Sequence, residues 1–121
     1  METYIEKSSK YEKLSSFPLE FFPLKMMITG AEVVRTKLGE QLLIYRDRDG
    51  LPPISSSSMS LIRQVKLWQD KFREIALAEI VIHKEPHVYN GLPTFKYYID
   101  NDVKVLEYRS KSEKMTFRWT V

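Results

Sequence analysis

The sequence has no cysteine, few glycines and no long hydrophobic run. Without cysteine, a disulfide framework, a cysteine nucleophile and a thiolate metal site are all excluded. The four glycines lie far apart, so they form no phosphate-binding loop and no dinucleotide-binding fingerprint. No apolar segment approaches the roughly 18 residues that a membrane span needs, and the polar residues 1–16 contain no apolar core of a signal peptide. We therefore expect a cytoplasmic protein that makes no membrane contact.

The composition is that of a single globular domain. The 121 residues are 43% hydrophobic and 29% charged, which is ordinary for a folded protein and too apolar for a disordered one. The formal net charge is +3 at pH 7. This small positive excess favours a polyanionic partner, although many proteins without such a partner share it.

The central part of the chain reads as five β-strands separated by turn signals. We predict strands over residues 25–36, 41–49, a short one from 54, then 75–85 and 93–100. Gly30 lies inside the first strand, where a glycine often marks a bulge or bend. Turns are predicted near Gly39, at Asp49–Gly50 and at Asn90–Gly91, with residues 86–91 as a loop.

One helix is predicted over residues 60–73, between the third and fourth strands. Its apolar residues recur at spacings of four, three and four, so they share one helical face. These residues are Leu61, Val65, Trp68 and Phe72. Ser58 or Ser60 is suited to cap the first turn by accepting an unpaired amide. We expect the striped face, Trp68 included, to be buried.

Segments on either side of this central region complete the chain. We divide it into an N-terminal arm and capping segment (1–23), a core (24–100) and a C-terminal hairpin (101–121). Pro18 and Pro23 should keep the phenylalanine-rich segment between them extended, so that it covers an edge of the core. In the C-terminal hairpin, Phe117 and Trp119 alternate with polar residues, and this apolar face must cover either the core or a second copy of the chain.

The order of elements predicts a mainly β fold. A helix between the third and fourth of five strands is the order of the OB-fold, a Greek-key barrel whose helix closes one end. A long first strand that bends at Gly30 suits this fold, because that strand must serve both sheets. We therefore predict a five-stranded OB-fold barrel with one helix between strands 3 and 4, plus a C-terminal β-hairpin.

Short motifs in this order resemble those of a known family. Ile28-Thr29-Gly30 lies in the first strand, Gly39-Glu40-Gln41 lies at the turn into the second, and Ser58 with Leu61 and Gln64 begins the helix. Over roughly residues 24 to 100, this arrangement resembles small OB-fold single-stranded DNA-binding proteins of phages and conjugative plasmids. The resemblance implies sequence-tolerant binding of single-stranded DNA in replication, recombination or plasmid transfer. The N-terminal arm and the C-terminal hairpin lie outside it.

Single-strand binders combine a basic groove with aromatic side chains on which bases stack. OB-folds place this surface on strands 2 and 3 and on the loops between strands 1 and 2 and strands 4 and 5. In this sequence the tyrosines are candidates for stacking and the basic residues for phosphate contacts. The candidate nucleic-acid-binding residues are Arg35, Lys37, Tyr45, Arg46, Arg48, Tyr89, Lys96 and Tyr98.

Several of these residues have a plain structural alternative. Tyr45 faces out if Leu42 and Ile44 face the core, but it could also pack under the N-terminal segment. Tyr97 and Tyr98 must point to opposite faces of their strand. Because Phe95, Tyr97 and Ile99 are the more apolar set, we assign them inward and leave Lys96 and Tyr98 outside. Arg48 could simply pair with a neighbouring aspartate.

No catalytic site is predicted. His83, Glu85 and His87 would share one face of a strand and could bind a metal. Pro86 interrupts that strand, however, and the chain has no third histidine. We read these residues as polar groups at a strand end, and we expect no metal and no cofactor.

Two functions follow from different classes of protein. The leading one is binding of single-stranded DNA, with RNA as an alternative strand, because nothing in the sequence reads a 2′-hydroxyl group. The other is a protein-interaction or assembly module of a phage or mobile element, which keeps the barrel without binding nucleic acid. In either case the C-terminal hairpin is a candidate surface for homo-oligomer formation.

Overall fold

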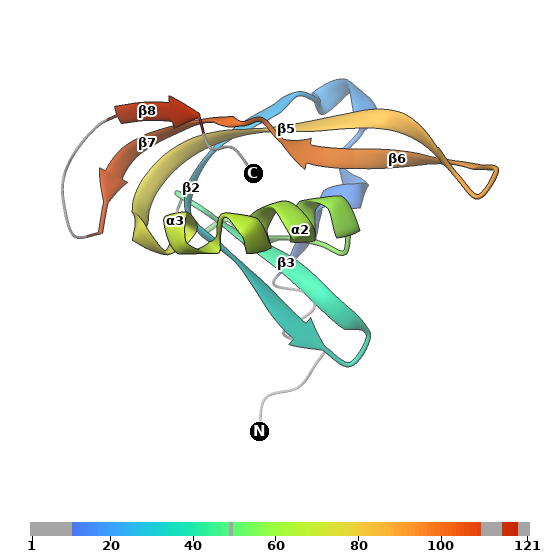
Figure 1. Cartoon of the computed structure of the whole chain (residues 1–121), viewed down its shortest axis with the longest axis horizontal. Helices are drawn as coiled ribbons and strands as arrows, with labels where there is room; N and C mark the ends of the chain where they lie inside the picture. Colours follow the sequence, from blue (N-terminus) through green and yellow to red (C-terminus); the bar gives the residue numbers. More distant parts are fainter. Residues whose placement is uncertain (1–10, 49, 110–114, 119–121) are drawn as a thin grey trace.

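The computed structural model of the protein describes residues 11–48, 50–109 and 115–118. Their strands form one mixed sheet, most of which curls into a half-barrel around a helical segment (Figure 1). The strands are β1 (Glu12–Lys13), β2 (Leu24–Thr36), β3 (Gly39–Arg46), β4 (Ile54–Ser56), β5 (Ile75–Tyr89), β6 (Leu92–Ile99), β7 (Asp102–Tyr108) and β8 (Met115–Arg118). The helices are α2 (Met59–Leu67) and α3 (Gln69–Glu74), with short 3₁₀ turns η1 (Leu14–Ser16) and η2 (Leu19–Phe21).

The strand order of the sheet is β1-β4-β3-β2-β5-β7-β8, and β6 also pairs with β5. All of these pairs are antiparallel except β1 with β4, which is parallel. Six strands, from β1 across to β6, make the half-barrel, and β7 adds a further strand bonded to β5. The predicted mainly β fold, with helix between the short strand and the next long one, is thus confirmed in outline.

The long first strand of the core bends where the sequence predicted. The pairing of β2 with β3 shifts register between Ile28 and Gly30, which is the signature of a β-bulge. On one side of the bulge β2 continues along β3, and on the other it pairs with β5. This bend lets one strand contribute to both sides of the curled sheet.

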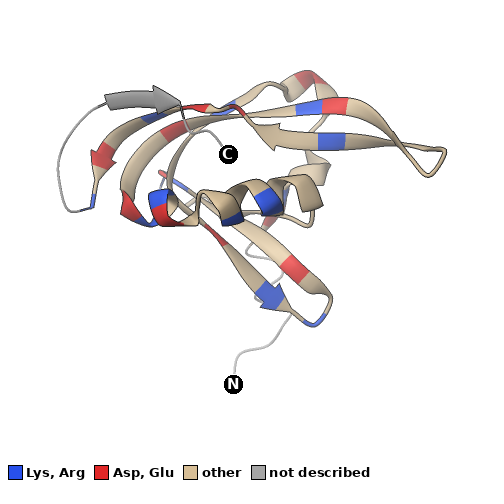
Figure 2. Cartoon of the chain, viewed as in Figure 1, with Lys and Arg blue, Asp and Glu red and all other residues tan. Residues whose placement is uncertain are grey.

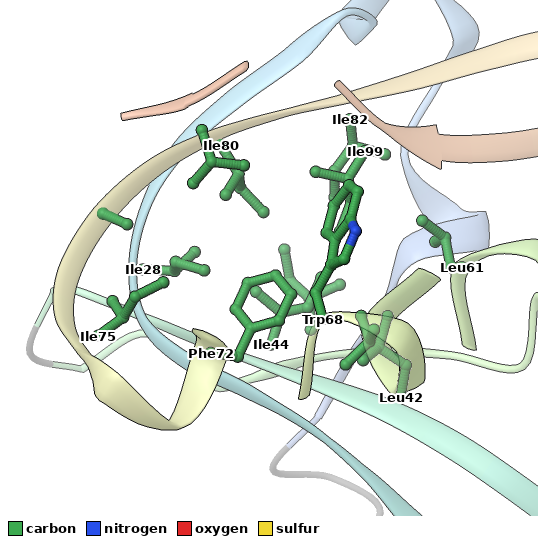
Figure 3. Packing of buried hydrophobic residues seen from close by; sticks show 14 of the residues in the cluster. Ile28, Leu42, Ile44, Leu61, Trp68, Phe72, Ile75, Ile80, Ile82 and Ile99 are labelled. Atoms are coloured by element: carbon green, nitrogen blue, oxygen red, sulfur yellow. The ribbon is translucent and has the colours of Figure 1, made fainter. Parts of the chain in front are cut away.

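The helical segment fills the inside of the half-barrel. The striped residues of the prediction are all buried, together with inward residues of β2, β3 and β5 (Figure 3). The Trp68 and Phe72 rings lie 6.2 Å apart within this cluster. The predicted single helix is wrong in one respect, because α2 ends at Leu67 and α3 begins at Gln69. Trp68 between them has φ −100° and ψ 14°, outside the helical region.

Part of the predicted N-terminal arm docks on the core. Among residues 11–16, β1 pairs with β4 and Leu14 is completely buried. The next segment is not simply extended, because η2 forms one helical turn there. Phe17 and Phe22 pack against the core as expected, whereas Phe21 is half-exposed.

Two predictions at the other end of the chain have different outcomes. The predicted loop at 86–91 is wrong, because β5 continues to Tyr89 and only Asn90–Gly91 form the turn, both with positive φ. Within the segment predicted as a C-terminal hairpin, the described residues of β7 and β8 pair antiparallel, and β7 also pairs with β5. Val103 and Val105 of β7 are buried in the core. The side chain of Phe117 and the whole of Trp119 lie outside the described residues, and so does the proposed apolar face.

Candidate nucleic-acid interface

A groove of about 1080 Å³ lies between the β5–β6 hairpin and the start of α2. In Figure 1 this hairpin projects well beyond the helix, and the β2–β3 hairpin diverges from it on the other side of α2. The wall opposite the hairpin comes from residues 55–60, with Gln41 of β3 and Lys13 of β1. The β5–β6 hairpin lies on one side of the groove, and the start of α2 with Gln41 of β3 lies on the other.

The charged residues that line the groove all carry positive charge. Lys13, Arg63 and Lys96 are its cations, and no Asp or Glu occurs among the described residues that line it. Figure 2 shows basic residues on both β6 and α2, the elements on either side of the groove. Since fields of one sign add inside a concave site, the groove favours an anionic ligand.

The lining also contains flat and hydroxylated side chains. Tyr89, Phe95 and Tyr97 contribute three aromatic rings, and six serines line the groove with them. The serines are Ser15, Ser55, Ser56, Ser57, Ser58 and Ser60. Rings offer stacking surfaces for bases. Hydroxyl groups can donate to or accept from the polar groups of a nucleic acid, whatever its base sequence.

The groove exists because the half-barrel is left open between two strands. In the described sheet, β4 pairs with β3 and β1, and β6 pairs only with β5. Side chains of α2 bridge this open seam instead. The Ser60 hydroxyl donates to the carbonyl of Tyr97 over 2.6 Å. Gln64 accepts from the Ile99 amide (2.7 Å) and donates to the Ile99 carbonyl (3.0 Å).

The serine-rich segment 55–58 leads from β4 into α2 along the wall of the groove. Ser58 caps the helix, as predicted, by accepting from the Leu61 amide at 3.5 Å. The hydroxyl of Ser56 accepts from the Ser58 amide at 3.1 Å. These local bonds fix the turn from β4 into the helix, which places the positive end of the helix dipole beside the groove.

The β5–β6 hairpin exposes large apolar side chains beyond the core. Val88, Tyr89 and Leu92 are 65%, 66% and 68% exposed, and Phe95 is 44% exposed. Phe95 shares a strand face with buried Ile99, as predicted, but it lies past the end of the core. Sequence reasoning missed Val88, Leu92 and the exposure of Phe95. An apolar surface on a projecting hairpin is typical of a binding site.

Two of the predicted binding residues, Tyr89 and Lys96, line the groove. Arg35 and Lys37 are exposed near the end of the β2–β3 hairpin, which contributes Gln41 to the groove. The structure therefore brings part of the predicted set together at the groove and places a second part at the neighbouring hairpin.

Tyr45 and Arg46 make hydrogen bonds and an ion pair outside the groove. The Tyr45 hydroxyl donates to the Glu32 carboxylate, and burial together with this bond raises the pKa of Tyr45 to about 12. Arg46 is only 12% exposed and forms an ion pair of 2.8 Å with Glu12. It also donates to the carbonyl of Pro52 at 2.7 Å. Arg46 thus ties β3 to β1, so we do not include it in the candidate interface.

Arg48 and Tyr98 lie away from the groove. Arg48 is exposed after β3, where it lines a second cavity of about 460 Å³ with Asp47 and Glu79. Tyr98 points to the opposite face of β6 from Tyr97 and stacks on His83, with ring centroids 4.8 Å apart. Burial, and next the charge of Glu85, raises the pKa of Tyr98.

The histidines considered as metal ligands form no such site in the described part of the chain. The Nε2 atom of His83 lies 3.2 Å from the Asp100 carboxylate, and His87 lines the groove. No group of three or more acidic, histidine or cysteine side chains gathers there as metal ligands would. Likewise, none of the helices described is long and apolar enough to span a membrane.

Comparison with known proteins gives no match to a family model, to a curated protein or to a solved structure. The functional argument therefore rests on the groove itself.

Proposed function

We propose that this protein binds single-stranded DNA, without strong sequence preference, in the groove between the β5–β6 hairpin and α2. The observation that carries the proposal is the lining of the groove, which combines three cations and three aromatic rings and has no carboxylate among its described residues. The cations can contact the backbone phosphates of a strand, and the rings give its unpaired bases a surface on which to stack. Single-stranded RNA presents the same kinds of phosphates and bases to these side chains, so it belongs to the same proposal.

The proposed fold is an open OB-fold. Strands β2 to β6 then correspond to its five strands, with the α2–α3 segment between the third and the fourth. The pairing of β2 with both β3 and β5 supports this assignment. The groove would lie at the seam where the third and fifth strands of a closed barrel meet. We propose a binding role rather than catalysis, in replication, recombination or transfer of a mobile element.

The direct test is a titration of fluorescently labelled dT oligomers at two salt concentrations. We expect binding to oligo-dT to be tighter than binding to duplex DNA of the same length. The slope of log K against log salt should be about −0.7 for each phosphate neutralised. Tighter binding to duplex, or no binding to either, would contradict the proposal.

A matched pair of variants locates the site. Lys96→Gln removes a cation of the groove, and Arg48→Gln removes an exposed cation outside it. Both variants lower the net charge by one, so a general charge effect would be equal in the two. We expect Lys96→Gln to reduce the magnitude of the salt slope by about 0.7 and Arg48→Gln to leave it unchanged. If Arg48→Gln reduced the salt slope and Lys96→Gln did not, the bound DNA strand would lie outside the groove.

One observation favours a second function. The exposed Val88 and Leu92 at the tip of the β5–β6 hairpin would also suit a protein partner. An assembly module of this kind would show no change in oligo-dT anisotropy, and Lys96→Gln would behave like the parent.

A further inference from the structure

Lys84 has an unusual environment for a lysine on a strand. It lies two residues beyond buried Ile82 on β5 and opposite Tyr97 of β6 in the sheet register. Its ammonium nitrogen is 4.6 Å from the ring centroid of Phe95 and 5.3 Å from that of Tyr97. The ring of Phe22 is 5.4 Å away. Three aromatic rings therefore surround one cation, each within the distance of a cation–π contact.

The same lysine holds the N-terminal segment in place. Its ammonium donates to the carbonyl of Phe17 at 3.4 Å. Phe22 meets Tyr97 edge-on, with centroids 6.0 Å apart and an interplanar angle of 64°. Lys84 thus joins the β5–β6 hairpin to the segment 17–22, which is distant from it in sequence.

Two of the three rings, Phe95 and Tyr97, also line the groove, whereas Lys84 does not. The charge of Lys84 is therefore directed at rings and a carbonyl rather than at the space where a phosphate would lie. A ring held by a cation loses less freedom when a base stacks on it, which is the energetic benefit of preorganisation.

We propose that Lys84 is a positioning residue for the groove: its ammonium holds Phe95 and Tyr97 in the orientation that receives bases, and it anchors segment 17–22 behind them. This inference rests on the proposed function. It separates Lys84 from the groove cations, because Lys84 acts through rings whereas Lys96 acts on the backbone of the strand.

The test uses three variants of the full chain, Lys84→Met, Lys84→Arg and Lys104→Met. Lys104 is exposed on β7 outside the groove, so its variant controls for the lost charge. We expect Lys84→Met to weaken oligo-dT binding about five- to tenfold with the parent's salt slope. Lys84→Arg should restore most of the affinity, because a guanidinium also binds ring faces. Lys104→Met should bind like the parent.

A second measurement is independent of nucleic acid. In the free protein, the ring-proton NMR shifts of Phe95 and Tyr97 should change in Lys84→Met and return toward the parent in Lys84→Arg. A salt slope reduced by about 0.7 in Lys84→Met would overturn the proposal, since Lys84 would then be a phosphate contact. Unchanged ring shifts would overturn it as well. If the parent binds no oligo-dT, the proposed function fails, and the ring shifts still decide whether Lys84 orders these rings.

Discussion

The two halves of β5 are both hydrogen-bonded within the sheet, the first to β2 and β7 and the second to β6, but their side chains have opposite surroundings. In the first half, Ile75, Ala78, Ile80 and Ile82 are buried under the helices and neighbouring strands. In the second half, every side chain from Glu85 to Tyr89 is exposed, although β6 pairs with it along its length. The strand continues to Tyr89 because its backbone pairing with β6 continues, whereas the burial of its side chains ends midway along it. The first half therefore determines stability and the second half presents a surface.

The largest effect is expected at the helix that fills the first region. Trp68→Ala removes a fully buried ring that contacts Phe72 and should lower the free energy of unfolding by about 3–5 kcal/mol. Leu67→Ala, at the exposed neighbouring position, is the control and should stay within about 0.5 kcal/mol of the parent. Urea denaturation measures both. A Trp68→Ala protein as stable as the parent would show that the helix does not fill the half-barrel.

A comparison within the strand itself tests the two halves directly. Ile80→Ala should lower the free energy of unfolding by about 2–5 kcal/mol, because Ile80 is completely buried. Val88→Ala lies on the same side of the strand in the exposed half and should change it by less than about 0.5 kcal/mol. If the Val88→Ala cost approached that of Ile80→Ala, the hairpin would be covered in solution, as in a self-associated form. Sedimentation would then detect the assembly.

The exposed half should matter for binding. Tyr89→Ala removes a ring from the groove and should weaken oligo-dT binding by about 1–3 kcal/mol without altering the salt slope. Tyr98→Ala removes a ring of the same hairpin that does not line the groove and stacks on His83, and it should bind like the parent. Fluorescence anisotropy at low and high salt distinguishes them. Equal losses in the two variants would argue against the groove.

The smallest effect concerns Tyr45, which is bonded to Glu32 rather than available for stacking. Its pKa in the folded protein is raised to about 12, above the ordinary value of 10. Its contribution to stability is therefore complete below pH 10 and is lost as the pH rises toward 12. In an absorbance titration at 295 nm, Tyr45→Phe should remove one tyrosine that ionises near pH 12. If the alkaline end of the titration is the same in both proteins, the bond to Glu32 is not formed.

The strands and the helix stripe could be predicted because they are local patterns. Alternating or helically spaced apolar residues mark the inward face of each element, and Gly30 and Asn90–Gly91 mark a bulge and a turn by backbone chemistry. The outer half of β5 could not be predicted in the same way. Its residues do not alternate regularly between apolar and polar, and Pro86 argues against a strand. In the structure Pro86 nevertheless lies opposite Phe95 in the pairing with β6.

The candidate site was predicted only in part, because its contacts are long-range. Exposure and residue type were enough to propose Tyr89 and Lys96. The ion pair of Arg46 with Glu12 and the rings around Lys84 each join segments that only the folded chain brings together. In the sequence Arg46 looks as free as Lys96, since nothing near it in the chain indicates its partner.

The seam bridged by Ser60 and Gln64 has a consequence for hydrogen exchange. The Ile99 amide is held by a side chain of α2 and not by a strand. Each of the three bridging bonds contributes about 0.5–1.5 kcal/mol net, so their combined loss costs less than the roughly 5–15 kcal/mol of global unfolding. The seam can therefore open while the rest of the sheet stays paired. Deuterium should enter at Ile99 before it reaches the β2–β5 ladder, and a ligand that spans the seam should slow that entry.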